Sequence, residues 1–212
     1  MSKLFNSRGL MKSMLVIGSA QVVNILISIV RMKVLAVLLG PSGVGLLSIY
    51  NSLLGMVKQT AGLGMESSGV REIASSRGDE ATLSRVRLVL FAAHLIQGTL
   101  AMIAVWILRD RIATWLFGGA EQATEVGLIG IAILLSLLAS AQTALLQGLR
   151  KIGDLGRVTV ISAFVGTLAG LAAVWLQSES GLIWFILVQP LAAVLIARHY
   201  TRRLPKPTAA RM

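Results

Sequence analysis

A long apolar run with two cations inside it, from Met11 to Gly45, is the feature that most constrains how this chain can fold. A helix that crosses a bilayer needs about 20 predominantly apolar residues, so the run predicts a membrane span. Arg31 and Lys33 stand inside it, and such a charge costs about 2.5–3.5 kcal/mol on insertion scales. We therefore expect this helix to line a polar path for an anionic, lipid-linked substrate.

Apolar blocks recur along the rest of the 212 residues, which are 55% hydrophobic, above the roughly 45–50% typical of soluble domains. The pattern predicts an all-α, polytopic membrane helix bundle of about six transmembrane helices. We expect a tight turn at Gly40–Gly43, a short interfacial helix near 70–74, a six-helix lobe over 1–198 and a basic cytoplasmic tail over 199–212. The expected spans are 13–39, 44–64, 87–108, 126–147, 157–177 and 181–198.

The lysines and arginines are distributed unevenly between the expected loops. Arg109 and Arg111 lie on one side of the expected membrane, whereas most other cations lie on the opposite side. Because cytoplasmic loops carry an excess of Lys and Arg, both termini are predicted to be cytoplasmic. This asymmetry also explains the net charge of +11 without a nucleic-acid partner. The cations on the predicted cytoplasmic side are Lys3, Arg8, Lys12, Arg71, Arg77, Arg85, Arg87, Arg150, Lys151, Arg157, Arg198, Arg202, Arg203, Lys206 and Arg211.

Polar residues in the first two spans recur at helical spacing and form the candidate substrate site. In the first span they are separated by three, four and three residues, which places them on one helix face. Arg31 and Lys33 can instead snorkel to an interface, and for Lys33 the two interpretations are equally favoured. Snorkelling is the favoured interpretation for Lys58. The predicted substrate-binding residues are Gln21, Asn24, Ser28, Arg31, Lys33, Asn51 and Gln59.

Small and weakly polar residues in the later spans are better explained by helix packing. Gly, Ser and Thr let membrane helices approach closely and hydrogen-bond to each other. We expect this role for Ser136, Ser140, Thr143 and Gln147 in the fourth span, and for Thr159, Ser162, Gly166 and Gly170 in the fifth. For His94, we favour a packed, neutral histidine over a proton relay.

The composition argues against several kinds of chemistry. The chain has no cysteine and only two histidines, and no Asp or Glu falls in the middle of an expected span. We therefore expect no metal, no other cofactor and no enzymatic activity, since neither a nucleophile with its base nor an acidic cluster is visible. Arg31 has no intramembrane carboxylate to pair with, and an unpaired guanidinium can bind a diphosphate bidentately.

Three segments together resemble a known family. These are RMKVLAVLLGPSGVG (Arg31–Gly45), GLGMESSGVREIA (Gly62–Ala74) and ALLQGLRKIGDLGRVTVISAFVGTLAG (Ala144–Gly170). They resemble the Wzx-type polysaccharide flippases, which export O-antigen and enterobacterial common antigen. Those flippases belong to the MATE-like multidrug/oligosaccharidyl-lipid/polysaccharide exporter superfamily. The resemblance covers nearly the whole chain, and the glycine–proline turn after a charged first helix is its most distinctive motif.

The resemblance implies membrane translocation of undecaprenyl-diphosphate-linked oligosaccharide for surface polysaccharide, O-antigen or lipopolysaccharide synthesis in the bacterial inner membrane. Arg31 aligns with a first-helix arginine of the related lipid II flippases. Family members enclose a cavity between two lobes, whereas this chain matches the N-terminal six-helix lobe alone. The expectation is therefore a fragment or half-transporter that needs a second lobe or a homodimer. The alternatives are a non-transporting membrane subunit of a glycan assembly complex, or a lobe of a related lipid II or drug exporter.

Overall fold

The computed structural model describes residues 7–202, and the side chains of residues 18–202. Every regular element among these residues is helical, so the predicted all-α membrane bundle is confirmed. Most of the predicted tail lies outside the described residues, although its first three residues continue the last helix. The elements are α1 (Ser7–Gly62), α2 (Met65–Ser75), α3 (Glu80–Phe117), α4 (Ala123–Gly148), α5 (Ile152–Gln177), the 3-10 turn η1 (Ser178–Ser180) and α6 (Gly181–Thr201).

Four helical stretches within the described residues are long and apolar enough to cross a membrane. Two of them are 45 and 50 residues long, about twice what a bilayer needs. Each of these two contains a change of direction, at Gly40 and at η1 respectively. The four stretches therefore accommodate the six expected crossings, and the chain is a multi-pass membrane protein. The stretches are Gly18–Gly62, Glu80–Phe117, Ala123–Gly148 and Ile152–Thr201.

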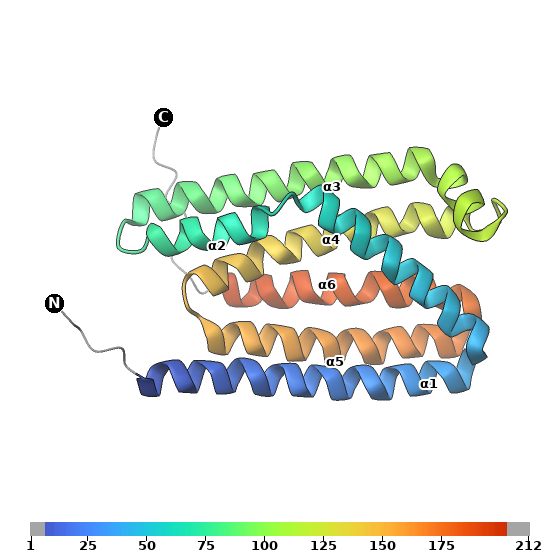
Figure 1. The fold of residues 1–212 in the computed structure, drawn as a ribbon, viewed down its shortest axis with the longest axis horizontal. Coiled ribbons are helices and arrows are strands. Elements are labelled where there is room, and N and C mark those ends of the chain that lie inside the picture. The colour runs from blue at the N-terminus through green and yellow to red at the C-terminus, as the bar shows by residue number, and fades with distance from the viewer. Residues whose placement is uncertain (1–6, 203–212) are drawn as a thin grey trace.

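The change of direction inside α1 depends on Gly40 alone. This residue has φ 69° and ψ −171°, a region of backbone space that is essentially restricted to glycine. Pro41 follows and begins the second half of the helix, where its fixed φ suits a first helical position and its missing N–H costs nothing. The turn is thus shorter than the expected Gly40–Gly43, and the second half of α1 runs back obliquely across the bundle (Figure 1).

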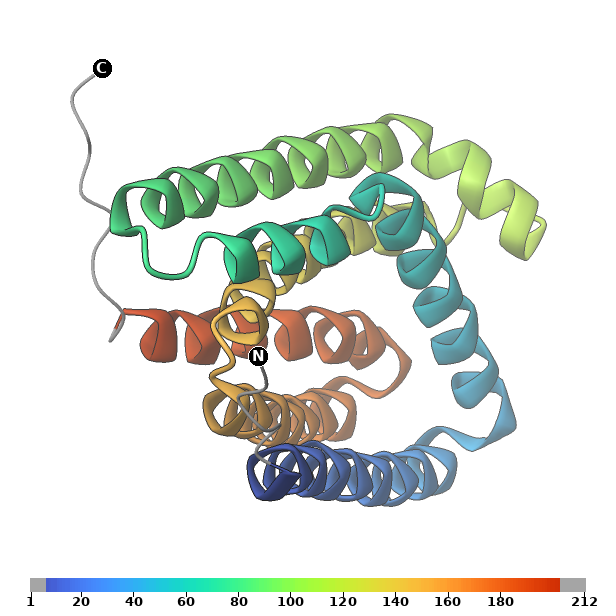
Figure 2. The ribbon, with the colours of Figure 1, turned by 60° about the vertical axis from the view of Figure 1, so that its left-hand side comes forward.

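The remaining long helices lie side by side in an order that differs from their order in the sequence. α3 contacts α4, α4 contacts α6, α6 contacts α5, and α5 contacts α1. Figure 1 shows this row from α3 at the top to the first half of α1 at the bottom, and Figure 2 shows the second half of α1 connecting the two ends of the row. The short helix expected near 70–74 is present as α2, which is longer than predicted and packs on α3 and α4. Its position at the membrane interface stays a prediction.

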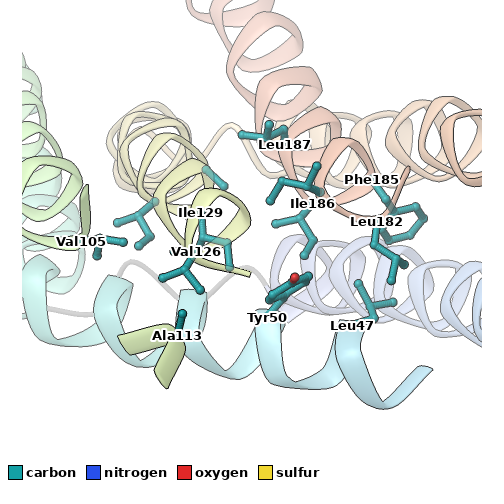
Figure 3. Close-up of a cluster of buried hydrophobic side chains, with 14 of the residues drawn as sticks. Leu47, Tyr50, Val105, Ala113, Val126, Ile129, Leu182, Phe185, Ile186 and Leu187 are labelled. Atoms are coloured by element: carbon teal, nitrogen blue, oxygen red, sulfur yellow. The ribbon is translucent and has the colours of Figure 1, made fainter. Parts of the chain in front are cut away.

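The second half of α1 contributes to the main hydrophobic core. Leu47 and Tyr50 are almost completely buried and point toward side chains of α4 and α6 (Figure 3). The Tyr50 ring also meets the Phe117 ring edge to face, with centroids 5.8 Å apart. Apolar side chains remain exposed on the outer surfaces of α1, α3 and α5, as expected of helices that face lipid.

The fold gathers the loop cations at one end of the bundle. The beginnings of α1 and α3, the α4–α5 connection and the end of α6 all lie at the left in Figure 1. Arg109 and Arg111 belong to the end of α3, which lies at the right. The separation expected from the sequence is therefore present in the described part of the chain.

Candidate functional site

Arg31 lies against α6, where two side chains hold its guanidinium. Its Nη1 donates a hydrogen bond to Gln189 Oε1 at 3.1 Å, and its Cζ lies 5.5 Å from the centroid of the Phe185 ring. Both partners are neutral. No carboxylate pairs with Arg31 among the side chains of residues 18–202, and its buried Nε has no hydrogen-bond partner there. The positive charge is therefore oriented by the protein but not neutralised.

Two glycines of α5 create the space for these partners of Arg31. A Cβ atom at Gly166 would lie 2.9 Å from Gln189 Cα, and one at Gly170 would clash with the Phe185 ring. Because neither glycine has a side chain, α6 approaches α5 closely enough to bring Gln189 and Phe185 to Arg31. The packing role predicted for the fifth span is confirmed, since Gly166 and Gly170 are both buried in this contact.

The other predicted residues of the first span lie in different environments. Asn24 and Ser28 are half-buried, like Arg31. Gln21 and Lys33 are exposed, so the polar stripe is sheltered only in part. The substrate-binding role of all of these residues stays a prediction.

The two remaining predicted residues, Asn51 and Gln59, both lie on the second half of α1 but have different surroundings. Asn51 is exposed, and its Nδ2 donates to Leu47 O of its own helix at 3.0 Å. Gln59 instead lines a cavity of about 620 Å³ between α1, α2, α3 and α4, which we call the polar pocket. Its lining residues are Gly55, Lys58, Gln59, Gly62, Gly64, Glu66, Ser67, Val70, Arg71, His94, Leu137, Ser140 and Gln147.

The polar pocket carries two cations from different helices. Lys58 comes from α1 and Arg71 from α2, and the one acidic residue in the lining is Glu66. Neither cation forms an ion pair with a carboxylate among the described side chains. The pocket therefore combines a net positive charge with amide and hydroxyl groups, a set that suits an anionic and hydroxyl-rich ligand.

Tight packing of α2 on α4 places Arg71 at the pocket. Ile73 is completely buried, and a Cβ at Gly148 would lie 2.6–2.7 Å from its side chain. Arg77 just beyond α2 donates its Nε hydrogen to Gly148 O at 2.9 Å and its Nη2 hydrogen to the same oxygen. A cation at the C-terminal end of a helix is also favoured by the helix dipole. Both the apolar packing of Ile73 and the hydrogen bonds of Arg77 therefore hold α2 and the residues just after it against α4.

His94 closes the pocket from α3. It is 1% exposed, and its Nδ1 lies 2.9 Å from Leu90 O of its own helix. A carbonyl oxygen only accepts, so Nδ1 carries the hydrogen in this contact. The expected packed histidine is confirmed as buried, and it also borders the pocket.

Several members of the polar pocket were not among the predicted substrate-binding residues. Lys58 was expected to snorkel, Arg71 to belong to a cytoplasmic loop with a short interfacial helix, and Ser140 and Gln147 to serve packing. Ser140 is indeed buried, whereas Gln147 is exposed and faces the pocket. The sequence does show polar residues near the same end of several spans. The spacing within one helix cannot show which helices become neighbours, so these residues could not be assigned to one pocket.

Comparison with known proteins identifies the family. Residues 10–202 match the family described as polysaccharide biosynthesis protein. No curated protein and no solved structure matched the chain. The family match extends over nearly all of the described helices, including those that carry Arg31 and the polar pocket. The chain therefore belongs to the polysaccharide biosynthesis protein family.

Proposed function

We propose that the chain is the N-terminal lobe of a Wzx-type flippase, which translocates a polyprenyl-diphosphate-linked oligosaccharide across the bacterial inner membrane. The observation that carries the proposal is the polar pocket, with Lys58 and Arg71 in a bundle whose outer surfaces are largely apolar. Its volume of about 620 Å³ lies in the usual range for ligand pockets. The family match to polysaccharide biosynthesis supports the same substrate class.

The position of the pocket suggests how the substrate is first bound. It is lined in part by α2, which lies in the half of the bundle nearer the end that carries most loop cations (Figure 1). That end is cytoplasmic under the positive-inside rule. Lipid-linked oligosaccharides are loaded from that leaflet. Lys58 and Arg71 bind the diphosphate, while Gln59, Ser140 and Gln147 offer hydrogen bonds to sugar hydroxyls. Each of these groups binds and orients the substrate, so no covalent step is required.

Arg31 supplies the next anion contact in this scheme. Its charge lies in a membrane span and is held by an amide and an aromatic ring, so it remains available to a passing diphosphate. A second lobe, from a longer chain or a second copy, encloses the path opposite this face. Both termini of the lobe are cytoplasmic in this arrangement, and the protein acts as a transporter and not as an enzyme.

The test removes both cations of the polar pocket. In the full-length gene product, Lys58→Gln/Arg71→Gln should lower surface glycan export about tenfold or more, because each charge-assisted hydrogen bond contributes about 1.5–3 kcal/mol. Glycan export is measured by surface labelling of cells, and substrate contact by crosslinking to a photoactivatable polyprenyl-diphosphate sugar. Both signals should fall together.

The matched control is Arg150→Gln/Lys151→Gln. It removes the same two residue types at the same end of the bundle, and neither residue lines the pocket. Export and crosslinking should stay near the wild-type level at equal protein abundance. Equal losses in the two double variants would contradict the proposed pocket role. Absence of crosslinking in the wild type would favour a non-transporting subunit instead.

A further inference from the structure

A second basic cavity lies apart from the polar pocket, between the start of α3, the end of α4 and the end of α6. It has a volume of about 370 Å³, and we call it the arginine cavity. Three arginines line it, and no acidic residue does. Its lining residues are Arg87, Leu88, Leu90, Phe91, Ala141, Gln142, Leu145, Arg198, Thr201 and Arg202.

The floor of the arginine cavity contains an unsatisfied acceptor. Gln142 is 9% exposed, and its buried Oε1 has no hydrogen-bond partner among the described residues. Leaving such a group unpaired costs about 1–3 kcal/mol. A ligand that fills this cavity therefore gains by donating a hydrogen bond to Gln142 as well as by carrying a negative charge.

The rim of the cavity is apolar and faces outward. Leu88 is 53% exposed and Phe91 is 41% exposed, and both lie beside the arginines. The last turn of α6 is fixed, since Arg198 O accepts from Thr201 Oγ1 at 3.2 Å and from Arg202 N at 3.0 Å. A cationic cavity edged by exposed apolar side chains matches the boundary between lipid headgroups and acyl chains.

We propose that the arginine cavity binds the headgroup of an anionic phospholipid that carries a hydroxyl donor, such as phosphatidylglycerol. The three guanidinium groups bind the phosphodiester. A headgroup hydroxyl donates to Gln142 Oε1, and the acyl chains run along Leu88 and Phe91. The bound lipid joins α3 to α6 at the end of the bundle, and this site is independent of the transported substrate.

The test measures binding of dioctanoyl phosphatidylglycerol to the purified full-length protein in a neutral detergent by native mass spectrometry. Arg87→Gln/Arg198→Gln/Arg202→Gln should weaken binding about tenfold or more. The matched control, Arg85→Gln/Arg150→Gln/Arg157→Gln, removes three arginines from the same end without changing the cavity lining. It should keep the wild-type affinity. Equal weakening in both variants would show a general charge effect and overturn the proposal.

Further probes separate the parts of the proposal. Dioctanoyl phosphatidylcholine should bind far more weakly, and inorganic phosphate should not compete at equal concentration. Competition by phosphate as strong as by the lipid would replace the lipid site with a free-phosphate site. Dioctanoyl phosphatidylethanol is a phosphodiester of the same charge without a headgroup hydroxyl, so the wild type should prefer phosphatidylglycerol to it and Gln142→Leu should lose that preference. If the triple variant does not fold, Arg202→Gln alone, at an exposed position, should still weaken binding, and an unchanged affinity would contradict the proposal.

Discussion

Two regions of this lobe treat positive charge in opposite ways. At Arg31 the guanidinium lies against α6, where Gln189 and Phe185 fix its position and the glycines of α5 allow close packing. In the polar pocket, Lys58 and Arg71 line an open volume of about 620 Å³. In the first region, contacts within the protein hold the cation in one position, and in the second region the cations border an open volume that a ligand can fill.

The difference follows from how deeply each cation lies in its membrane span. A cation deep in a span needs local partners, because the bilayer offers no water to solvate it. A cation near the end of a span can remain available, since headgroups and water are within reach. Changes at the Arg31 contact should therefore alter stability, whereas changes in the polar pocket should alter function first.

The largest expected effect on stability comes from Gln189→Leu. This variant removes the acceptor of the Arg31 hydrogen bond, and hydrogen bonds to charged groups contribute about 1.5–3 kcal/mol. The free energy of unfolding in mixed micelles should fall by that amount. Gln147→Leu in the polar pocket is the comparison, and it should change stability by no more than about 0.5 kcal/mol, because Gln147 is exposed. Similar losses in the two variants would remove the distinction between the regions.

Gly166→Ala tests the close approach that supports the Arg31 contact. The new Cβ would lie 2.9 Å from Gln189 Cα, and such overpacking costs about 1–3 kcal/mol. Gly55→Ala provides the control, since Gly55 lines the polar pocket and a Cβ there meets nothing within 4 Å. Thermal unfolding should show a clear loss for the first variant and none for the second. A stable Gly166→Ala protein would mean that α6 can shift without penalty.

Gly40→Ala tests the change of direction inside α1, which places Arg31 and Lys58 on two differently oriented halves of that helix. With φ 69° and ψ −171°, alanine at this position should cost about 1–3 kcal/mol in backbone strain. Gly45→Ala, in the regular helix after the change of direction, should instead stabilise by about 0.5–1 kcal/mol, since a Cβ there has open space. Thermal unfolding of both variants in the same detergent provides the measurement. The same sign of change in both would refute a special role for Gly40.

The smallest expected effect concerns Asp79, which caps α3, the helix that carries His94. The Thr82 hydroxyl and the backbone N–H groups of Thr82 and Ala81 donate to this carboxylate and lower its pKa. A lowered folded-state pKa contributes stability above the unfolded pKa, and this contribution is lost as pH falls through the folded value. The melting-temperature difference between wild type and Asp79→Asn should therefore be largest near neutral pH and shrink in acid. A difference that does not vary with pH would contradict this assignment.

Patterns confined to one helix could be predicted from the sequence, whereas contacts between helices could not. Five of the six expected spans fall within the helices, and the other, 44–64, extends two residues beyond the end of α1 at Gly62. The stripe of Ser162, Gly166 and Gly170 on α5 packs as predicted. The sequence shows no carboxylate partner for Arg31 within a span, and the neutral amide of Gln189 that accepts its hydrogen bond lies 158 residues away in the chain. This residue precedes Pro190, which α6 accommodates within one continuous helix.

The sequence by itself determined the membrane class, the helix positions and the gathering of cations at one end. Each of these follows from local hydrophobicity and charge, which a chain carries before it folds. Only the tertiary structure decided that α6 lies between α4 and α5, that Arg31 contacts Gln189, and that four helices enclose the polar pocket. Helix neighbours depend on how side chains fit across interfaces. That fit involves residues far apart in the chain, and no periodicity along a single helix encodes it.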